Sequence, residues 1–519
     1  MWHVYLPLHI AEGGSATRKL GTHRAPLYTK SHLPILAPFF FSQRNTIMRT
    51  LLLSFVLVLL TSSYLAAENT RPNVLILIGD DIDRDSLGPW GGQAHTPNLD
   101  QLAKDGMRLD DVYANTAMCA PFRQELYSGR TVWRTRAMPN HSKSVAGTQS
   151  LPHYLQPLGY RVGLLGKTHI GPKDAYPFDY LGDVSKQKDG NPQLVQRAKA
   201  YITAAKQAGD PFCLVVASHD GHGPFTTGDP SQYDKEALEM EVDKIDTPAY
   251  RSEYQLHLAE VTNLDKLLGE LRGVLAEEKL TDNTLVIFCS EQGNSFPFAK
   301  WSCFNDGLAS GVVVALPGTI PAGKSSDQLT WIADITPTLV EAVGVKAAAE
   351  DFDGKSQWQN WTGGNQQVHE YAYGAFTNCN IIGNRDRVYP IRSIRDDRFT
   401  LIWSPRHDEE ITSNTTLTEA LAWLESEPKD GKASTAATWV RKAKRTKTEA
   451  DDQLVHRLHH RPEWALYDRM TDPEELTNLI DDPKHAQDAE RLKKELQAWL
   501  AKWNDADPVA TERSFLPTN

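Results

Sequence analysis

Cysteine is scarce in this chain, with five among 519 residues. That number is too small for a disulfide scaffold of the kind that small secreted domains use to replace a large core. Basic residues are also outnumbered, because 55 Lys and Arg face 66 Asp and Glu and leave a net charge of −11. A protein that follows nucleic-acid phosphates normally presents a basic face. The composition therefore argues against a nucleic-acid partner.

Long hydrophobic runs are nearly absent. The clearest is residues 51–60, which follow Arg49 and precede the small-residue site Leu65-Ala66-Ala67. This run is too short to span a bilayer comfortably and has the layout of a secretion signal. We expect residues 48–67 to be a removed signal and 1–47 to be a non-native extension before the true start. The expected location is secreted or periplasmic, or lysosomal in a eukaryote, with no stable membrane anchor.

Four apolar runs of strand length each end in polar, glycine-flanked residues: 73–78, 161–165, 212–217 and 284–289. Such runs are typical of strands buried on both faces of a parallel sheet, whose carboxyl ends bind ligands. Residues 253–274 have helical apolar spacing between two of them. The pattern predicts an α/β fold with a large mixed, mostly parallel sheet sandwiched by helices.

The pattern changes near residue 365. Residues 389–394 and 398–403 indicate two strands joined by a turn, residues 464–468 a further strand, and the end of the chain an amphipathic helix. The polar stretch of about 405–460 is interpreted as a surface insertion. We therefore expect a catalytic domain over 68–365 and a smaller C-terminal α+β domain over 366–519, as the length also suggests.

Cys119 stands two residues before Pro121 at a predicted helix start. A thiol there could be a nucleophile of lowered pKa, because helix N-termini favour negative charge. The alternative is a buried structural cysteine. The local residues leave both interpretations open.

Asp80-Asp81 and Glu291-Gln292 each follow a predicted strand and offer only oxygen ligands. Oxygen sites favour Ca²⁺ or Mg²⁺, although an Asp pair can also cap a helix. Several cationic side chains would suit an anionic substrate group, while each alone could be an ordinary surface or structural residue. They are Arg123, Lys167, His169, His222 and Lys300. His219 and Lys173 are interpreted as structural.

The segment Cys119-x-Pro121-x-Arg123 with Gly129-Arg130 resembles the signature of the type I sulfatases of the alkaline-phosphatase superfamily. Further segments occur in that family's order: 79–81, 166–171, 222–224 and 290–300. The resemblance extends from about Arg71 to about Pro508. Within the family the chain is most similar to the sulfamidases, the N-sulfoglucosamine sulfohydrolases (heparan N-sulfatases).

The resemblance implies that a formylglycine-generating enzyme oxidises Cys119 to formylglycine, whose hydrated aldehyde attacks sulfur. It implies Ca²⁺, with Mg²⁺ less favoured, held by the modified Cys119 and four oxygen donors: Asp80, Asp81, Glu291 and Gln292. Arg123 and Lys167 would steady the nucleophile, and His169 would act as a base. His222 and Lys300 would hold the sulfate and protonate the leaving group. The implied substrate is a sulfated saccharide; oligomer formation is left open.

Three features depart from the family pattern. Glu291-Gln292 stands where most members have Asp followed by Asn or His, so we expect a shifted backbone or altered metal affinity. Phe122 replaces a small polar residue of the signature, but we still expect Cys119 to be converted to formylglycine. No histidine pair of the sulfamidase kind is evident in the C-terminal part, where Thr377-Asn378 is the expected replacement.

The alternatives are an O-sulfatase acting on another polysaccharide, a phosphonate or phosphate-ester hydrolase, and an inactive glycan-binding relative. Paired zinc sites of the phosphatase kind are not evident. Binding alone would not require the full set of Cys119, Arg123, Lys167, His169 and Lys300. The sequence therefore favours an enzyme.

Overall fold

The structure, a computed structural model, describes residues 71–184, 190–345, 348–380, 387–416 and 435–516. The expected extension and signal, residues 1–67, lie outside this part. An eight-stranded sheet has the order β5 (Asp179–Tyr180), β4 (Arg161–Gly166), β6 (Phe212–Ala217), β1 (Asn73–Gly79), β7 (Thr284–Ser290), β8 (Val312–Ala315), β2 (Met107–Leu109) and β9 (Lys324–Ser326). The strands from β5 to β7 are parallel, and β8 is antiparallel to both neighbours. The predicted mixed, mostly parallel sheet is confirmed.

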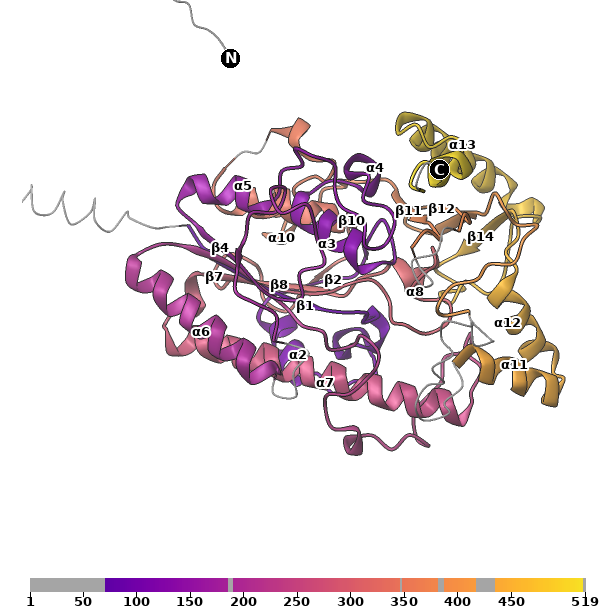
Figure 1. Ribbon diagram of the computed structural model, residues 1–519, viewed down its shortest axis with the longest axis horizontal. Coiled ribbons are helices and arrows are strands. Elements are labelled where there is room, and N and C mark those ends of the chain that lie inside the picture. The colour runs from indigo at the N-terminus through magenta and orange to yellow at the C-terminus, as the bar shows by residue number, and fades with distance from the viewer. Residues whose placement is uncertain (1–70, 185–189, 346–347, 381–386, 417–434, 517–519) are drawn as a thin grey trace, which may run out of the picture. The chain divides into compact units, whose positions relative to one another are not determined.

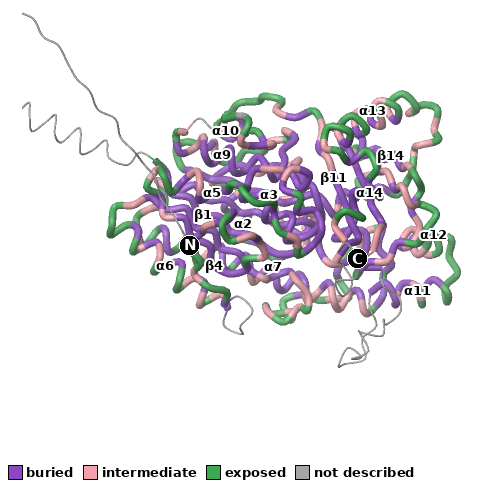
Figure 2. The backbone as a smooth tube through the Cα atoms, turned by 45° about the horizontal axis from the view of Figure 1, so that its top comes forward, coloured by how far each residue is buried: buried purple, intermediate pink, exposed green. Residues whose placement is uncertain are grey.

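Helices cover both faces of this sheet (Figure 1). Alternate residues of β1 point to opposite faces, as strand geometry requires. Leu75 and Leu77 pack with α2 (Pro97–Asp105), α6 (Gly190–Ala208) and α7 (Pro248–Glu277). Val74, Ile76 and Ile78 pack with α3 (Cys119–Ser128), α5 (Leu151–Leu155) and α9 (Ile335–Ala342). The central strands are therefore buried on both sides (Figure 2).

Helix α7 contains the predicted helix 253–274 and extends beyond it at both ends. The hydroxyl of Thr247 accepts a hydrogen bond from the backbone N–H of Tyr250, and Pro248 occupies the first turn. Both features favour a helix start. The predicted apolar stripe is buried, as at Leu264 and Leu268. Within the described residues, no helix has both the length and the apolar character needed to cross a membrane.

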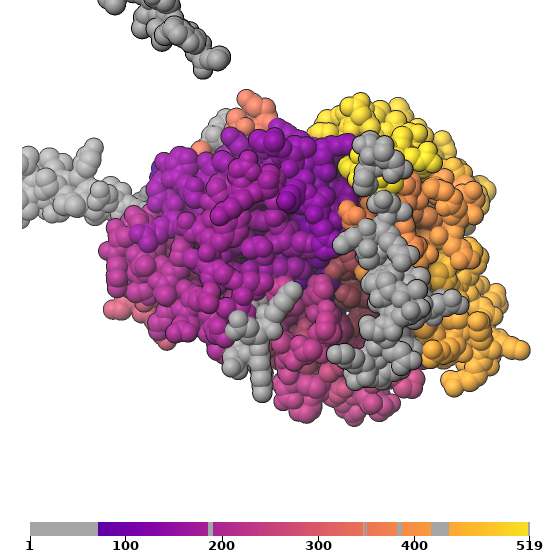
Figure 3. Space-filling view, viewed as in Figure 1, coloured from indigo at the N-terminus to yellow at the C-terminus, as the bar shows by residue number. Residues whose placement is uncertain are grey.

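A four-stranded antiparallel sheet follows, in the order β11 (Ala372–Phe376), β12 (Ile391–Arg395), β13 (Phe399–Trp403) and β14 (Trp464–Asp468). Three of these strands match the predicted ones. Helix α13 (Ala486–Lys502) covers one face through Leu492, Leu496 and Leu500. These later segments, orange to yellow in Figure 3, form one flank of the face shown. The domain boundary near residue 365 stays a prediction.

The interpretation of residues 405–460 as a surface insertion is wrong for their described C-terminal part. Residues 435–446 and 449–459 form α11 (Thr435–Thr446) and α12 (Glu449–His459). Trp439 is completely buried, and Leu454 and Leu458 join the same hydrophobic core. The helices are amphipathic, so their abundant charges cover one face while the other packs inward. Residues 417–434 lie outside the described part.

Candidate active site

Cys119 is the first residue of α3 and is 2% exposed. The predicted position at a helix start is confirmed. Of the two interpretations left open, a lowered thiol pKa is wrong for the unmodified residue, because burial raises the pKa of Cys119 although Lys167 and Lys300 act to lower it. Desolvation destabilises the buried thiolate by more than the helix N-terminus and the two lysines stabilise it. The unmodified side chain is therefore a poor nucleophile.

The oxygen ligands come together because β1 and β7 are paired in parallel. Gly79 is in register with Ser290, so Asp80-Asp81 and Glu291-Gln292 leave neighbouring strands at the same sheet edge. Ligand atoms of Asp80, Asp81, Glu291 and Cys119 all lie within 4.8 Å of one another. The nearest helical turn, Arg84–Ser86, has Asp83 as its N-cap residue. The helix-cap interpretation of Asp80-Asp81 is therefore wrong.

Gln292 shows that this oxygen set suits a hard cation. Its amide nitrogen donates a hydrogen bond to Oδ1 of Asp81 at 2.5 Å. Its Oε1 is buried and accepts no hydrogen bond from any described residue. Burial, together with the charge of Asp80, raises the pKa of Glu291 well above its usual value despite the opposing effect of Arg123. A cation among these oxygens would satisfy the amide and relieve the repulsion between carboxylates.

Three cationic side chains surround the carboxylates. Lys167 forms an ion pair with Asp80, and Arg123 forms one with Glu291. Lys300 Nζ lies 2.6 Å from Asp81 Oδ1 and 3.5 Å from Cys119 Sγ. Burial by itself would raise the pKa of Asp80, but Lys167 holds it well below the usual value. The predicted cations therefore converge on the same group of oxygens.

Two predicted histidines lie around this cluster. His222 Nε2 is 3.7 Å from Asp81 Oδ2. His169, which follows β4, has its Nε2 2.7 Å from Nδ1 of His141. Burial first, and then the charge of Lys167, lower the pKa of His169 to about 2. His169 is therefore neutral near pH 7, with an unprotonated ring nitrogen, although so low a pKa also makes it a weak base.

Three residues near the cluster were not predicted. His219, interpreted as structural, has Nδ1 3.7 Å from Asp80 Oδ2 and Nε2 2.9 Å from Asp183 Oδ2. Ser295 donates a hydrogen bond to Asp81 Oδ2 at 2.8 Å. His219 and Ser295 follow the same strand ends as predicted residues, which was a usable signal. His141 lies in a loop between α4 (Val132–Thr135) and α5, and no motif marks it.

Thr377 and Asn378, the expected replacement for a histidine pair, are both buried. The side-chain amide of Asn378 donates to the backbone oxygen of Thr412 at 2.9 Å. In the same segment, Thr415 Oγ1 donates to the backbone oxygen of Lys300 at 3.4 Å. Asn378 therefore contacts a segment, residues 412–415, that also contacts the backbone of Lys300.

The comparisons with known proteins agree with this geometry. The family model described as Sulfatase matches residues 72–345. An ulvan-active sulfatase of Formosa agariphila is 29% identical, over 85% of this chain and 82% of its own length. The human N-sulphoglucosamine sulphohydrolase is 25% identical, over 84% of this chain and 91% of its own.

A solved structure bound to its substrate, D-glucosamine-2-N,6-O-disulfate, has the same fold. It is 18% identical, with a TM-score of 0.63, and the match covers 85% of this chain and 99% of that one. The matched family region contains the strand ends that carry Asp80, Lys167, His222 and Glu291, together with Cys119 and Lys300. By this match the chain belongs to the sulfatase family, and it is a hydrolase of that family.

Proposed function

We propose that this hydrolase removes sulfate from a sulfated glycan, with the sulfamate of N-sulfoglucosamine as the first candidate group. The observation that carries the proposal is the buried oxygen cluster beside Cys119, flanked by Lys167 and Lys300. The human relative, matched over most of both chains, favours a sulfamate. The ulvan-active relative favours an O-sulfate on a polysaccharide and is the second candidate.

Cys119 is proposed to act as formylglycine, and the buried oxygens are proposed to hold Ca²⁺. When present, the aldehyde supplies a nucleophile that the buried thiol cannot, and the cation polarises a sulfate oxygen. The proposed metal ligands are residue 119 and four oxygen donors: Asp80, Asp81, Glu291 and Gln292. All four donors come from the ends of β1 and β7.

The remaining side chains have distinct proposed tasks. Lys167 and Lys300 keep fixed positive charge beside Cys119, where a sulfate group would be attracted. Arg123 is held by Glu291 and by the backbone oxygen of Lys167, to which it donates at 3.0 Å. His169 is the proposed base, because it is neutral and its Nδ1 is buried without a hydrogen-bond partner in the described part.

The leaving nitrogen or oxygen must gain a proton when its bond to sulfur breaks. His222 and Lys300 both contact Asp81 and are the proposed proton sources. Conversion of Cys119 would require a formylglycine-generating enzyme. A removed signal at residues 48–67, and with it a secreted, periplasmic or lysosomal location, also belongs to this proposal.

Mass spectrometry of the peptide containing Cys119 tests the mechanism. Protein produced together with a formylglycine-generating enzyme should carry an aldehyde at position 119, and activity should rise with the converted fraction. Full activity of protein with an unmodified thiol would overturn the mechanism. Cys119→Ala should abolish sulfate release while the protein remains folded.

Sulfate release from matched saccharides tests the substrate. The panel contains N-sulfated glucosamine, the same sugar with only a 6-O-sulfate, a sulfated ulvan oligosaccharide and a phosphonate monoester. Preferred release from the N-sulfated sugar would support the first candidate. Preference for an O-sulfate or for the phosphonate would replace it with the corresponding alternative. Binding without any hydrolysis by converted protein would indicate a glycan-binding relative.

A further inference from the structure

A cavity of 1310 Å³ lies between α12 and the segment around β14, and the proposed reaction does not use it. Its lining is rich in nitrogen donors: Arg457, Arg461, Lys447, His407, His456 and His460. Two carboxylates, Glu449 and Asp452, also line it, but both are exposed and belong to the first turn of α12. Arg457 lies in the last turn of that helix, and Arg461 follows its C-terminal end.

Arg461 is a buried cation without a carboxylate partner. It is 7% exposed, and no Asp or Glu among the described residues lies within ion-pair distance of it. Its Nη1 donates to the backbone oxygen of His460 at 3.3 Å, and its Nε is buried without a partner in the described part. Burial first, and then the neighbouring charge of Arg457, lower the pKa of Arg461 to about 10. An uncompensated buried charge is costly.

Arg457 adds a second guanidinium to the same place. Its Cζ lies 4.6 Å from the ring centre of Phe298 and 4.3 Å from that of Phe304, and Phe304 also lies 5.3 Å from Cζ of Arg461. Nη2 of Arg457 donates to the backbone oxygen of Glu475 at 2.9 Å, while Nη1 is buried without a partner in the described part. Aromatic stacking stabilises a cation only weakly and leaves its N–H donors without acceptors.

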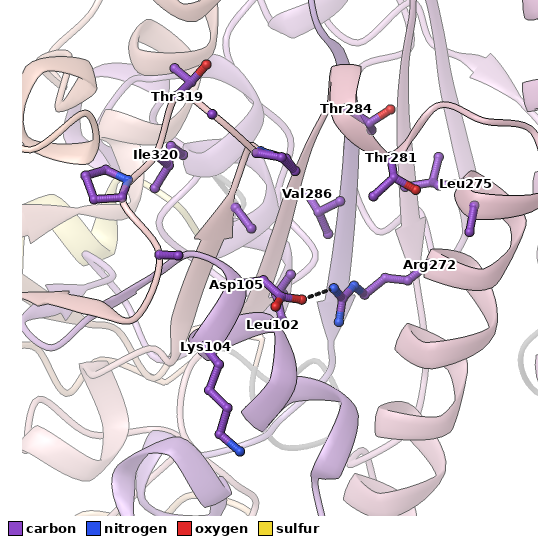
Figure 4. Close-up of a pocket in the computed structure, with 16 residues that line it drawn as sticks. Leu102, Lys104, Asp105, Arg272, Leu275, Thr281, Thr284, Val286, Thr319 and Ile320 are labelled. Carbon is purple, nitrogen blue, oxygen red and sulfur yellow. Dashed lines mark hydrogen bonds and ion pairs between the residues drawn. The ribbon is translucent and has the colours of Figure 1, made fainter.

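Most other buried cations in the described part of the chain are paired; Arg395, which stacks on Tyr113, also lacks an ion pair but does not line this cavity. Arg392 forms an ion pair with Asp505, and Lys244 contacts Asp243 and Asp306. A second cavity, of 760 Å³ beside the start of β7, contains Arg272 paired with Asp105 (Figure 4). The Arg457–Arg461 cavity differs because its buried cation faces a space large enough for a ligand. A ligand with oxyanion character would provide the missing acceptors.

We propose that the Arg457–Arg461 cavity is a second, non-catalytic binding site for a sulfate-type oxyanion. The shared chemistry is a tetrahedral oxyanion that accepts hydrogen bonds from the two guanidinium groups. It has two sources: free inorganic sulfate, and a sulfate group on a saccharide segment remote from the bond that is cleaved. The saccharide source rests on the proposed function, whereas the oxyanion site itself does not.

Calorimetric titration of the full chain carrying Cys119→Ala tests the site without turnover. The ligands are sodium sulfate and a heparin-derived sulfated tetrasaccharide, at matched ionic strength. Adding Arg461→Met should weaken binding at this site by about ten-fold or more, because charged hydrogen bonds contribute roughly 1.5–3 kcal/mol. Adding Arg445→Met instead, which removes an exposed arginine of α11, should leave binding unchanged. If Arg461→Met weakens the binding of sulfate alone, the cavity is a site for the free anion. If it weakens the binding of the tetrasaccharide, the cavity is a glycan subsite.

Equal binding of both ligands with and without Arg461→Met would overturn the proposal. Should Arg461→Met unfold the protein, the double variant Lys447→Ala and His456→Ala changes only exposed lining residues and should weaken binding several-fold. Unchanged binding by that double variant would then overturn the proposal. A protein that fails to release sulfate but binds sulfate through Arg461 would refute the proposed function alone.

Discussion

Lys300 Nζ lies 3.5 Å from Cys119 Sγ and 2.6 Å from Asp81 Oδ1, and so connects the proposed nucleophile position to a proposed metal ligand. Burial alone would lower the pKa of Lys300, but Asp81 raises it above its ordinary value. The ammonium group therefore stays charged at all physiological pH values. One side chain can thus balance a carboxylate and hold positive charge beside residue 119.

Replacement of Lys300 by Met should reduce kcat by about 10²–10³-fold, the effect of removing one preorganised charge-stabilising donor. The same change leaves the buried carboxylate of Asp81 without its ion pair, so metal-free protein should also lose stability. Steady-state sulfate release and thermal unfolding measure the two effects. Lys173→Met, at an exposed lysine, is the matched control and should change neither. A Lys300→Met enzyme with ordinary kcat would refute the proposed role.

Removal of divalent cations with a chelator should lower the melting temperature, and added Ca²⁺ should restore it, because a bound ion stabilises only the folded state. Gln292→Ala should shift the Ca²⁺ concentration needed for half-restoration upward by about ten-fold or more. The amide oxygen of Gln292 is one of the buried acceptors of the cluster that lack a hydrogen-bond partner within the described residues. Titration of the melting temperature with Ca²⁺ and Mg²⁺ measures this effect without relying on turnover. An identical Ca²⁺ response in wild type and Gln292→Ala would exclude Gln292 as a ligand.

His169→Ala should reduce kcat by about 10²–10⁴-fold, as expected for loss of a general base. His141→Ala removes only the hydrogen-bond partner of His169 and should cost about 1 kcal/mol, or roughly five-fold in rate. His141→Asn, which keeps a polar side chain in the same loop, should recover part of that loss. Single-turnover rates distinguish these effects from substrate binding. Equal losses for His141→Ala and His169→Ala would instead assign His141 a direct part in proton transfer.

The free energy of unfolding of Glu512→Gln should increase relative to that of the wild type as pH rises. Burial raises the pKa of Glu512 to about 8, although Arg392 acts to lower it. The folded state therefore holds this proton more tightly than the unfolded state, whose Glu pKa is about 4.3. Stability from Glu512 is fully present below that value and is lost as pH rises toward 8, by at most about 1.4 kcal/mol per pH unit.

Denaturant unfolding of wild type and Glu512→Gln at pH 5 and at pH 8 measures this difference. The variant should gain on the wild type between the two pH values, because glutamine keeps the acceptor for the backbone N–H of Tyr389 but does not ionise. Glu463→Gln, at an exposed glutamate, is the control and should not change with pH. A constant difference between wild type and Glu512→Gln would show that Glu512 is already ionised at pH 5.

The strands of the main sheet could be predicted from the sequence because strands buried on both faces must be continuously apolar. The runs at 73–78 and 284–289 became β1 and β7 with ends shifted by one residue. Their polar ends could be predicted as a site because parallel strands place their carboxyl ends at one edge. The prediction of a surface insertion at 405–460 is wrong because only some residues of an amphipathic helix such as α11 face inward, so the stretch as a whole is polar. Trp439 is one of these inward-facing, buried residues.

Local sequence determined which chemical groups are present: a cysteine at a helix start, oxygen ligands at two strand ends and lysines after a third strand and a loop. Tertiary structure decided their states and partners. Burial raises the pKa of Cys119 against the effect of its helix position, and a loop distant in sequence brings His141 to His169. It also leaves Arg461 buried without a carboxylate within the described chain. Desolvation and long-range contacts set these properties, and both arise only when distant segments pack together.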